Sequence, residues 1–319
     1  MIFSGEQQTA EPIVEIGFGC DAGYIQPLTI AISSVLTTAR EPSRLRFWLI
    51  TNSLDEQALA PLRGMIEAVG ARLETRAPVA REAISEMPLG EHFTEATYYR
   101  LLFADLLPAS VKRLIYLDSD VIVRHAIEDL WAVDLGAHST GAVFNPRALN
   151  FRQMGLRREA DYFNAGVLIL DLNKWREQQI HRRALTFAAE FPGKLVCADQ
   201  DALNHVLAGA WTRLDLRWNQ QYKFFKQSAR QLGVPFLGLW RARSGPYIVH
   251  YSTNTKPWHS GNQHPWRGLY FDQLDQTHFR GWRPTASAKG RSRSRTLRRC
   301  RQSARALKSL LLRRLRSHR

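Results

Sequence analysis

The sequence has little cysteine, no long apolar run and no recognisable export signal. Only three of its 319 residues are cysteines, and Cys20, Cys197 and Cys300 lie far apart. Such spacing favours neither a disulfide framework nor a zinc cluster. No stretch reaches the roughly 18 uninterrupted apolar residues that a membrane span needs. The N-terminus carries Glu6 and Glu11 instead of a basic segment followed by an apolar one, so we expect no signal peptide and a cytoplasmic location.

Acidic residues are absent from the end of the chain. Residues 286–319 contain 13 Lys or Arg residues and no Asp or Glu. Subtracting these 13 charges from the net charge of +15 leaves +2 for everything before them. The composition, 45% hydrophobic and 23% charged, is typical of a soluble globular protein. We therefore predict one nearly neutral domain over residues 1–283 and a basic tail over residues 284–319.

The tail combines its arginines with apolar residues at helical spacing, namely Leu297, Ala304, Leu307, Leu311 and Leu315. This pattern predicts a basic amphipathic helix that lies on an anionic membrane. A solvated, disordered tail is the alternative. Nucleic-acid binding is a third interpretation, but no aromatic residues separate the arginines, so we expect no nucleic-acid partner.

Strand-like and helix-like segments alternate along the predicted domain. Predicted strands cover residues 14–19, 46–50, 72–76, 114–117, 141–144, 167–172 and 248–251. Predicted helices run through Ile30 and Val35 and over residues 56–69, 97–106, 173–191 and 198–207, with Ser53 as the cap of the helix over 56–69. The alternation predicts an α/β sandwich with a central, mostly parallel sheet.

Two acidic residues stand directly after the apolar run at 114–117, in Asp118-Ser119-Asp120. Carboxylates confined to one small volume repel each other unless a cation lies between them. Oxygen ligands favour Mg²⁺ or Mn²⁺, and such an ion can neutralise a departing nucleotide diphosphate. Ligands of open α/β sheets bind beyond the carboxyl ends of the strands, and Asp21 also follows a predicted strand. The alternative is an acidic pair that merely ends a strand, which is common for an isolated motif of this kind.

Several further segments appear in a fixed order around this motif. They cover residues 18–24, 97–100, 114–120, 163–166, 199–201 and 250–258, and together they extend over about 75% of the chain. In this order they resemble glycosyltransferase family 8, and specifically the bacterial lipooligosaccharide and lipopolysaccharide galactosyl- and glucosyltransferases. The resemblance implies a GT-A type nucleotide-sugar-binding sandwich and transfer of the sugar with retention of anomeric configuration.

The resemblance also implies a metal site. Asp118 would touch the metal and the ribose, Asp120 would chelate the metal, and His250 would complete a site for Mn²⁺ or Mg²⁺. Lys256 would contact the diphosphate and favour departure of UDP. Outside this pattern, His250 is better explained as a partly buried structural histidine and Lys256 as a solvated surface lysine.

Other residues correspond to the donor site of the family. Gly19 and Cys20 would offer backbone groups to the base, Asp21 would face the uracil or ribose, and Tyr24 and Ser119 would join the nucleotide site. Arg100 would bridge donor sugar and phosphate, although a helix-surface arginine is the alternative. Asn164 would bind the hexose, Asp199 would hold its hydroxyls, and Gln200 would lie beneath the anomeric carbon.

Three positions qualify the resemblance. Gly23 replaces an Asn that is frequent in the family, so one side-chain contact to the nucleotide is missing or is made by another residue. Asn145 replaces an Asp of some galactosyltransferases, so the contacts inferred there are in doubt. His92 corresponds to a histidine that approaches the acceptor or the nucleotide.

These features predict a manganese-dependent enzyme that moves galactose or glucose from a UDP-sugar to a cell-surface glycan acceptor such as lipopolysaccharide core. We expect it on the inner face of the cytoplasmic membrane. A neutral amide oxygen is a weak nucleophile, so front-face attack is favoured over a covalent adduct on Gln200. The alternatives are a metal-dependent nucleotide-sugar hydrolase, and a non-catalytic protein that binds membrane or nucleic acid through its basic tail.

Overall fold

The computed structural model describes residues 12–78, 87, 94–146, 148 and 150–285. The prediction for His92 and the prediction for residues 286–319 of the basic tail therefore lie outside the described residues. Among the described residues, no helix has the length and apolar character needed to cross a membrane.

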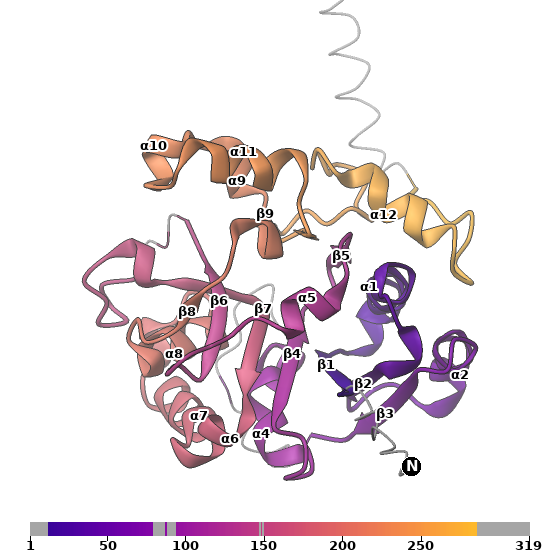
Figure 1. Cartoon of the computed structure of the whole chain (residues 1–319), viewed down its shortest axis with the longest axis horizontal. Helices are drawn as coiled ribbons and strands as arrows, with labels where there is room; N and C mark the ends of the chain where they lie inside the picture. The colour runs from indigo at the N-terminus through magenta and orange to yellow at the C-terminus, as the bar shows by residue number, and fades with distance from the viewer. Residues whose placement is uncertain (1–11, 79–86, 88–93, 147, 149, 286–319) are drawn as a thin grey trace, which may run out of the picture.

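A seven-stranded sheet occupies the centre, with the strand order β3-β2-β1-β4-β7-β6-β8 (Figure 1). The strand β7 is antiparallel to both of its neighbours, and the other pairs are parallel. This sheet confirms the predicted α/β fold. The strands are β1 (Val14–Gly19), β2 (Leu45–Ile50), β3 (Arg72–Arg76), β4 (Arg113–Leu117), β6 (Thr140–Phe144), β7 (Phe163–Asp171) and β8 (Thr212–Arg213).

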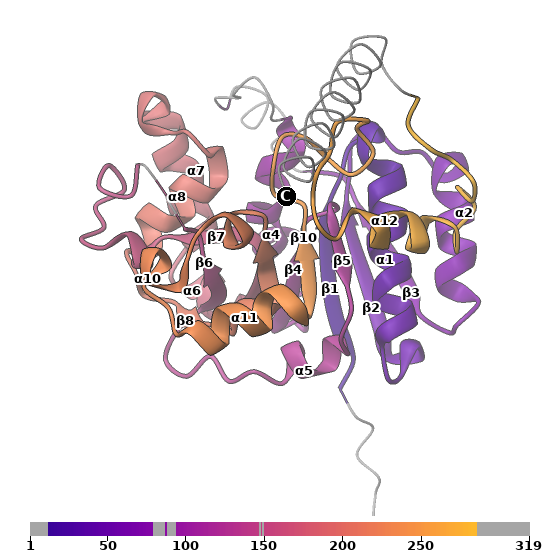
Figure 2. The ribbon, with the colours of Figure 1, turned by 90° about the horizontal axis from the view of Figure 1, so that it is seen from above.

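Helices cover both faces of this sheet. The crossovers from β1 through α1 to β2 and from β2 through α2 to β3 move outward toward one edge of the sheet. The connection from β3 returns across the sheet to β4, on the other side of β1. Because such crossovers are right-handed, α1 and α2 lie on one face, and η3 and α4 lie on the opposite face. The helices α6, α7 and α8 pack with η3 and α4 on that second face. Figure 2 shows α1 and α2 beside β1, β2 and β3, well separated from α7 and α8.

The helices of these layers are α1 (Ile25–Thr38), α2 (Glu56–Glu67), α4 (Phe103–Leu106), α5 (Ile127–Trp131), α6 (Leu172–Glu177), α7 (Ile180–Glu190) and α8 (Ala198–Leu207). Short 3-10 helices are η1 (Ala22–Tyr24), η2 (Pro42–Arg44), η3 (Glu95–Leu102), η4 (Glu159–Asp161), η5 (Pro192–Lys194) and η6 (Leu216–Asn219).

A second, three-stranded sheet brings distant parts of the chain to the end of β4. It consists of β5 (Val121–Val123), β10 (Ile248–His250) and β9 (Gln220–Gln221), with β10 in the middle. His250 lies opposite Val121, the residue after Asp120, and the Tyr251 amide donates to the Asp120 carbonyl at 3.0 Å. The pairing of β5 with β10 therefore sets His250 beside the Asp118-Ser119-Asp120 motif.

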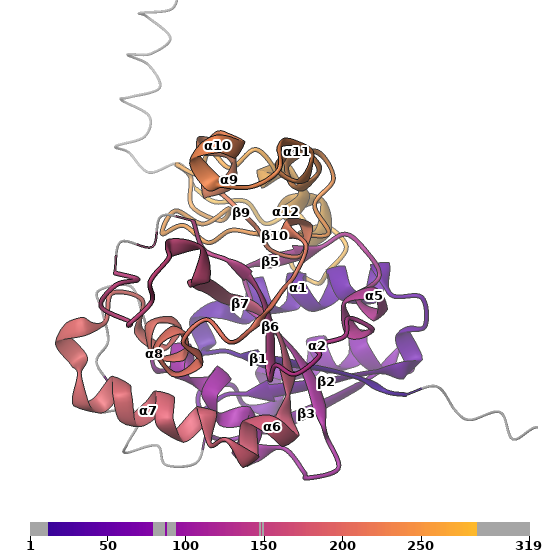
Figure 3. The ribbon, with the colours of Figure 1, turned by 60° about the vertical axis from the view of Figure 1, so that its left-hand side comes forward.

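Four further helices lie on the same side of the molecule as this small sheet (Figures 1 and 3). They are α9 (Lys223–Lys226), α10 (Ala229–Leu232), α11 (Phe236–Ser244) and α12 (Arg267–Leu274). The helix α12 packs on α1 around a separate apolar cluster that contains Ile30, Ile122, Val249, Tyr251 and Tyr270.

Several local predictions were wrong. Ser53 does not cap α2: its hydroxyl accepts from the Ala22 amide at 2.9 Å, and Asp55 caps the helix through the Ala58 amide at 2.8 Å. The helix predicted over 173–191 is two helices, because Gln179 adopts a left-handed conformation with φ of 50°. The helix predicted over 97–106 is mostly 3-10, as η3. The strand β7 begins four residues before the predicted one, at Phe163.

Candidate active site

Three side chains with metal-ligand chemistry meet beyond the end of β4. The Nε2 atom of His250 lies 3.6 Å from Asp118 Oδ2 and 3.3 Å from Asp120 Oδ1. One ligand atom of each residue lies within 4.8 Å of the other two. Two carboxylate oxygens and an imidazole nitrogen in this arrangement suit a divalent cation. The structure thus brings together the three residues assigned to the metal from the sequence.

The ring of His250 is oriented by Asn219, which the sequence did not single out. The Gly166 amide donates to Asn164 Oδ1 at 3.1 Å, which fixes the orientation of the Asn164 amide group. Asn219 Nδ2 donates to the same oxygen at 2.8 Å, so Asn219 Oδ1 faces His250 Nδ1, at 2.9 Å. Because this oxygen can only accept, Nδ1 carries a proton. In the neutral ring, Nε2 then points its lone pair at two carboxylates, an arrangement that fits a bound cation.

Lys256 lies against the same site and is not a solvated surface residue. Its ammonium group is 2.5 Å from Asp120 Oδ2 and donates to the Tyr251 carbonyl at 3.0 Å. Burial favours the neutral acid of Asp120, but the charge of Lys256, followed by the interaction with His250, outweighs it and holds the pKa of Asp120 below its ordinary value. Asp120 is therefore a carboxylate with one oxygen toward Lys256 and the other toward His250.

Arg100 is a buried residue of the site and not a helix-surface arginine. Its guanidinium lies 3.0 Å from Asp118 Oδ1 and 2.7 Å from Asp199 Oδ2. Burial opposes the charge, but Asp118 and Asp199 outweigh it and raise the pKa of Arg100 above its ordinary value. Tyr116 also donates to Asp118 Oδ1, at 2.9 Å, so Asp118 Oδ2 is the oxygen that faces His250.

Asp199 is a buried carboxyl with an open hydrogen-bonding position. Burial raises its pKa to about 7; the charge of Arg100 opposes this rise, and the charges of Asp118 and Asp201 add to it. The Arg100 Nε–H donates to the Thr97 carbonyl at 3.3 Å, and Asp199 Oδ2 accepts no hydrogen bond within the described part of the chain. A buried acceptor of this kind fits a sugar hydroxyl.

Gln200 is held at both ends of its amide group. Its Oε1 accepts from Asn164 Nδ2 and from the Ala165 amide, each at 3.0 Å, and its Nε2 donates to the Tyr162 hydroxyl at 3.0 Å. Tyr162 in turn donates to Asp201. An oxygen that already accepts two hydrogen bonds is a still weaker nucleophile.

Gly166 leaves the space that the metal-ligand side chains occupy. A Cβ atom at this position would lie 2.3 Å from His250 Cε1 and 2.6 Å from Asp118 Oδ2. The register of β7 against β6 shifts between Ala142 and Val143, which forms a bulge at this stretch of β7. The Gly166 carbonyl accepts from the Asp118 amide at 2.8 Å, so the bulge also holds the acidic motif in place.

The residues predicted to bind the base form a neighbouring group at the end of β1. A Cβ atom at Gly19 would lie 2.9 Å from Tyr99 Cβ, so the backbone comes close to η3 there. The Cys20 thiol donates to the Asp21 carbonyl at 3.1 Å, and burial raises its pKa, which keeps it neutral. Ser119 is also buried. The Cys20 amide donates to the Ile50 carbonyl at 3.0 Å, and the contacts of Gly19, Cys20 and Ser119 with the nucleotide stay predictions.

Asp21 precedes η1 as its N-cap, and Tyr24 is the last residue of η1. Asp21 accepts from the Gly23 amide at 2.9 Å and from the Thr94 hydroxyl at 2.7 Å, so it stabilises this turn as a cap. Burial, followed by the charge of Asp120, raises the pKa of Tyr24. The Tyr24 ring packs edge-on against Trp258, with centroids 5.6 Å apart, and the nucleotide contacts of Asp21 and Tyr24 stay predictions.

A pocket of about 200 Å³ joins most of these groups. Eight predicted site residues line it: Arg100, Asp118, Asp120, Asn164, Asp199, Gln200, His250 and Lys256. It also contains residues for which the sequence offered no assignment, namely Thr97, Cys197, Gln221, Lys223 and Ser252. Gly19, Cys20, Asp21, Tyr24 and Ser119 are not among its lining residues.

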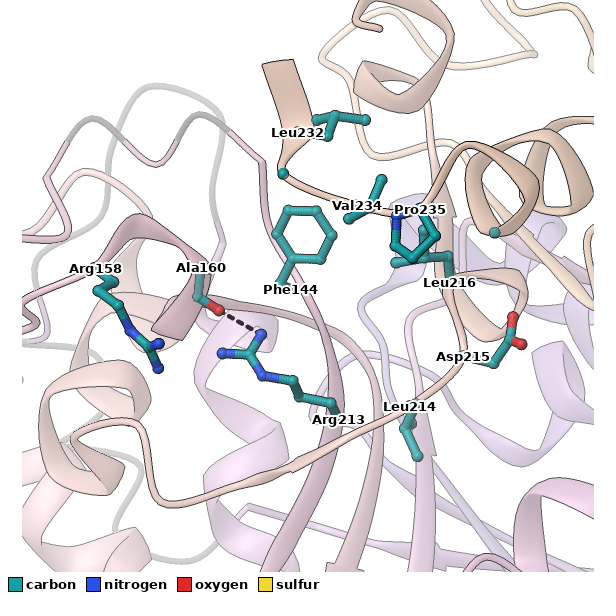
Figure 4. Close-up of a pocket in the computed structure, with 12 residues that line it drawn as sticks. Phe144, Arg158, Ala160, Arg213, Leu214, Asp215, Leu216, Leu232, Val234 and Pro235 are labelled. Carbon is teal, nitrogen blue, oxygen red and sulfur yellow. Dashed lines mark hydrogen bonds between the residues drawn. The ribbon is translucent and has the colours of Figure 1, made fainter. Parts of the chain in front are cut away.

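A larger cavity, of about 460 Å³, lies elsewhere (Figure 4). Its lining is mainly apolar, with Leu232, Val234 and Pro235 beside Phe144, and Arg213 donates to the Ala160 carbonyl at its edge. We assign the chemistry to the smaller pocket, because that pocket holds the converging carboxylates, the imidazole and the buried cations.

The sheet with its acidic motif at the end of β4 defines a nucleotide-sugar-binding α/β protein of GT-A type. The sequence model of the family "Glycosyl transferase family 8" matches residues 15–262. General stress protein A of Bacillus subtilis is 30% identical over 84% of this chain and 95% of its own length. A lipopolysaccharide 1,2-glucosyltransferase of Escherichia coli is 25% identical, over 79% of this chain and 75% of its own.

The fold is likewise similar to that of the galactosyltransferase LgtC, solved in complex with donor and acceptor sugar analogues. The two structures superpose with a TM-score of 0.74 over 88% of this chain and 99% of the other, at 24% sequence identity. The chain therefore belongs to glycosyl transferase family 8 and is a glycosyltransferase.

Proposed function

We propose that this glycosyltransferase moves a hexose, galactose or glucose, from a UDP-sugar to a glycan or glycolipid acceptor such as lipopolysaccharide core. The observation that carries the proposal is the convergence of Asp118, Asp120 and His250, with Lys256 beside Asp120. Relatives named as lipopolysaccharide 1,2-glucosyltransferase and lipopolysaccharide 1,3-galactosyltransferase support the choice of sugar and acceptor class.

The three ligand residues would hold Mn²⁺ or Mg²⁺, and the bound ion would neutralise the diphosphate of the leaving UDP. Lys256 would move toward the same phosphates, because its present partner Asp120 also faces the cation site. Gly19, Cys20, Asp21, Tyr24 and Ser119 would bind uridine at the end of β1. Arg100 would bridge the sugar and the phosphate.

The hexose would lie over the buried polar network. Asp199 Oδ2 would accept from a sugar hydroxyl, and Asn164 would donate to another. Gln200 would lie beneath the anomeric carbon as a positioning residue, because both ends of its amide are already engaged.

Retention follows from front-face attack. Gln200 has no free oxygen lone pair of useful basicity, and the Asp199 carboxylate is paired with Arg100. The acceptor hydroxyl would therefore attack from the side of the departing phosphate and pass its proton to a phosphate oxygen. A glycosyl adduct trapped on Asp199 or Gln200 would contradict this route.

Nucleotide-sugar hydrolysis is the weaker alternative. Water needs no sugar cradle, whereas Arg100, Asn164, Asp199 and Gln200 form a buried one. We also propose that the enzyme works at the inner face of the cytoplasmic membrane and is held there by its basic tail.

The proposal is tested with a panel of UDP-sugars, by measuring UDP release with and without acceptor sugars at varied Mn²⁺. We expect release that requires Mn²⁺ or Mg²⁺, increases with a hexose acceptor, and is lost in Asp120→Ala. Asp272→Ala is the matched control, since this exposed carboxylate lies on α12, outside the site. Acceptor-independent release, or full activity of Asp120→Ala, would refute the assignment.

A further inference from the structure

The helix α11 directs large apolar side chains away from the protein. Phe236, Leu237 and Trp240 are 76%, 52% and 55% exposed, while Leu239 and Ala242 on the same helix are buried. Within the described residues, four large hydrophobic side chains are more than half exposed: these three and Val196. Their spacing places them on one side of a two-turn helix, so α11 has an inner apolar face and an outer one.

The segment of chain that contains α11 carries basic residues and no acidic ones. Residues 216–271 contain eight Lys or Arg residues and no Asp or Glu. Three of these cations, Lys226, Arg230 and Arg241, are exposed on or next to α9, α10 and α11. The nearest preceding acid, Asp215, is paired with Arg217 at 2.9 Å and also interacts electrostatically with Arg241, so this single acid is outnumbered by the cations around it. The α11 surface, defined as Phe236, Leu237 and Trp240 with these three exposed cations, is thus both apolar and basic.

The position of the α11 surface connects it to the catalytic pocket. The helix packs on η6 and α9; η6 carries Asn219, and α9 begins at the pocket residue Lys223. It lies on the same side of the molecule as α12, after which the described chain ends at Thr285 (Figures 1 and 3). The apolar cavity of Figure 4 adjoins its beginning, through Pro235 and Gly238.

We propose that the α11 surface binds an anionic lipid bilayer directly, as a membrane contact in addition to the basic tail. Aromatic and leucine side chains insert at the boundary between head groups and acyl chains, and neighbouring cations pair with anionic head groups. An anionic bilayer offers an apolar layer for the three exposed side chains and negative head groups for the three exposed cations at the same time. The proposal rests on the proposed function in one respect, namely the lipid-linked acceptor. Because α11 packs on α9 and η6, a bilayer bound at α11 would bring such an acceptor close to the pocket.

The first test measures vesicle binding by the full chain, with sedimented vesicles of phosphatidylethanolamine and phosphatidylglycerol, and with phosphatidylcholine vesicles as reference. Phe236→Ser/Leu237→Ser/Trp240→Ser is expected to lower the partition coefficient about tenfold or more. Lys226→Glu/Arg230→Glu/Arg241→Glu should remove the preference for anionic vesicles that the surface contributes. The matched control, Val69→Ser/Phe191→Ser, changes exposed apolar residues that follow α2 and α7 and should bind as the unaltered chain does.

The second test separates the α11 surface from the tail. Amide hydrogen exchange of the unaltered chain, followed by mass spectrometry, should slow over residues 235–244 when anionic vesicles are added, and stay unchanged over α2 and α7. Unchanged exchange at α11, together with unchanged partitioning of the serine variant, would overturn the proposal. So would a serine variant that changes a dimer into a monomer without lipid, because the surface would then be a protein interface.

UDP release by each variant, measured without vesicles, shows whether the site is intact. If the unaltered chain releases no UDP, the proposed function is refuted. Loss of vesicle binding with release retained is the result expected for the α11 surface.

Discussion

The side-chain oxygen of Asn219 lies 2.9 Å from Nδ1 of His250, and this contact decides which nitrogen of the ring faces Asp118 and Asp120. Asn219 is fully buried and its own amide group is oriented by Asn164. We expect Asn219→Ala to weaken Mn²⁺ binding about 10- to 100-fold, because the ring loses the partner that sets its tautomer and direction.

The measurement is Mn²⁺ affinity by isothermal titration calorimetry, independent of turnover. Asn219→Asp keeps an acceptor next to Nδ1 and should recover part of the affinity. Asn254→Ala, at an exposed position, serves as control. Equal Mn²⁺ affinity of Asn219→Ala and the unaltered chain would show that Asn219 does not set the tautomer and orientation of the His250 ring.

Gly166→Ala should abolish metal binding. The added methyl group would meet His250 Cε1 at 2.3 Å and Asp118 Oδ2 at 2.6 Å, well inside contact distance, so at least one ligand must move. Gly64→Ala is the matched control, because no atom lies within 4 Å of its Cβ position in α2. There we expect unchanged metal binding and about 0.5–1 kcal/mol of added stability from the better helix propensity. Both outcomes are read from Mn²⁺ titrations and thermal unfolding.

Lys256→Gln should reduce the rate of UDP release about 100-fold or more, because a positive charge near the departing diphosphate is lost. The reduction should appear in kcat at saturating donor. Lys112→Gln, outside the site, should release UDP at the normal rate. An unchanged kcat with a raised KM would instead assign Lys256 to ground-state binding of the donor.

Asp199 should make folding stability depend on pH. Its pKa is raised from 3.8 to about 7 in the folded chain, mainly by burial. Between these values the folded protein holds a proton that the unfolded chain has released, so this contribution to stability is complete below about pH 4 and is lost as the pH rises through about 7. Asp199→Asn removes the titration. The melting temperature of this variant, relative to the unaltered chain, should therefore increase from pH 4 to pH 7.5. A constant difference across that range would contradict the raised pKa.

The first half of the fold followed from local pattern. Apolar runs such as 114–117 are buried on both faces of a sheet, and their alternation with helical segments predicted a mostly parallel sheet, which β1, β2, β3 and β4 form. Local pattern did not predict the ends of helices, because neighbouring side chains compete for the same backbone hydrogen bonds there. Asp55 replaces Ser53 as the cap of α2, and Gln179 divides one predicted helix into α6 and α7.

The sequence by itself determined the kinds of groups in the site: the two carboxylates after a buried strand, and, through family resemblance, an arginine before them and two amides, a histidine and a lysine after them. Only the tertiary structure decided how they meet. The pairing of β10 with β5 sets His250 opposite Val121, the bulge in β7 places Gly166 under the ligands, and η6 supplies Asn219. Periodicity records which face of an element is buried, whereas the partner of each strand depends on packing across the whole chain, and no short stretch of residues contains that information.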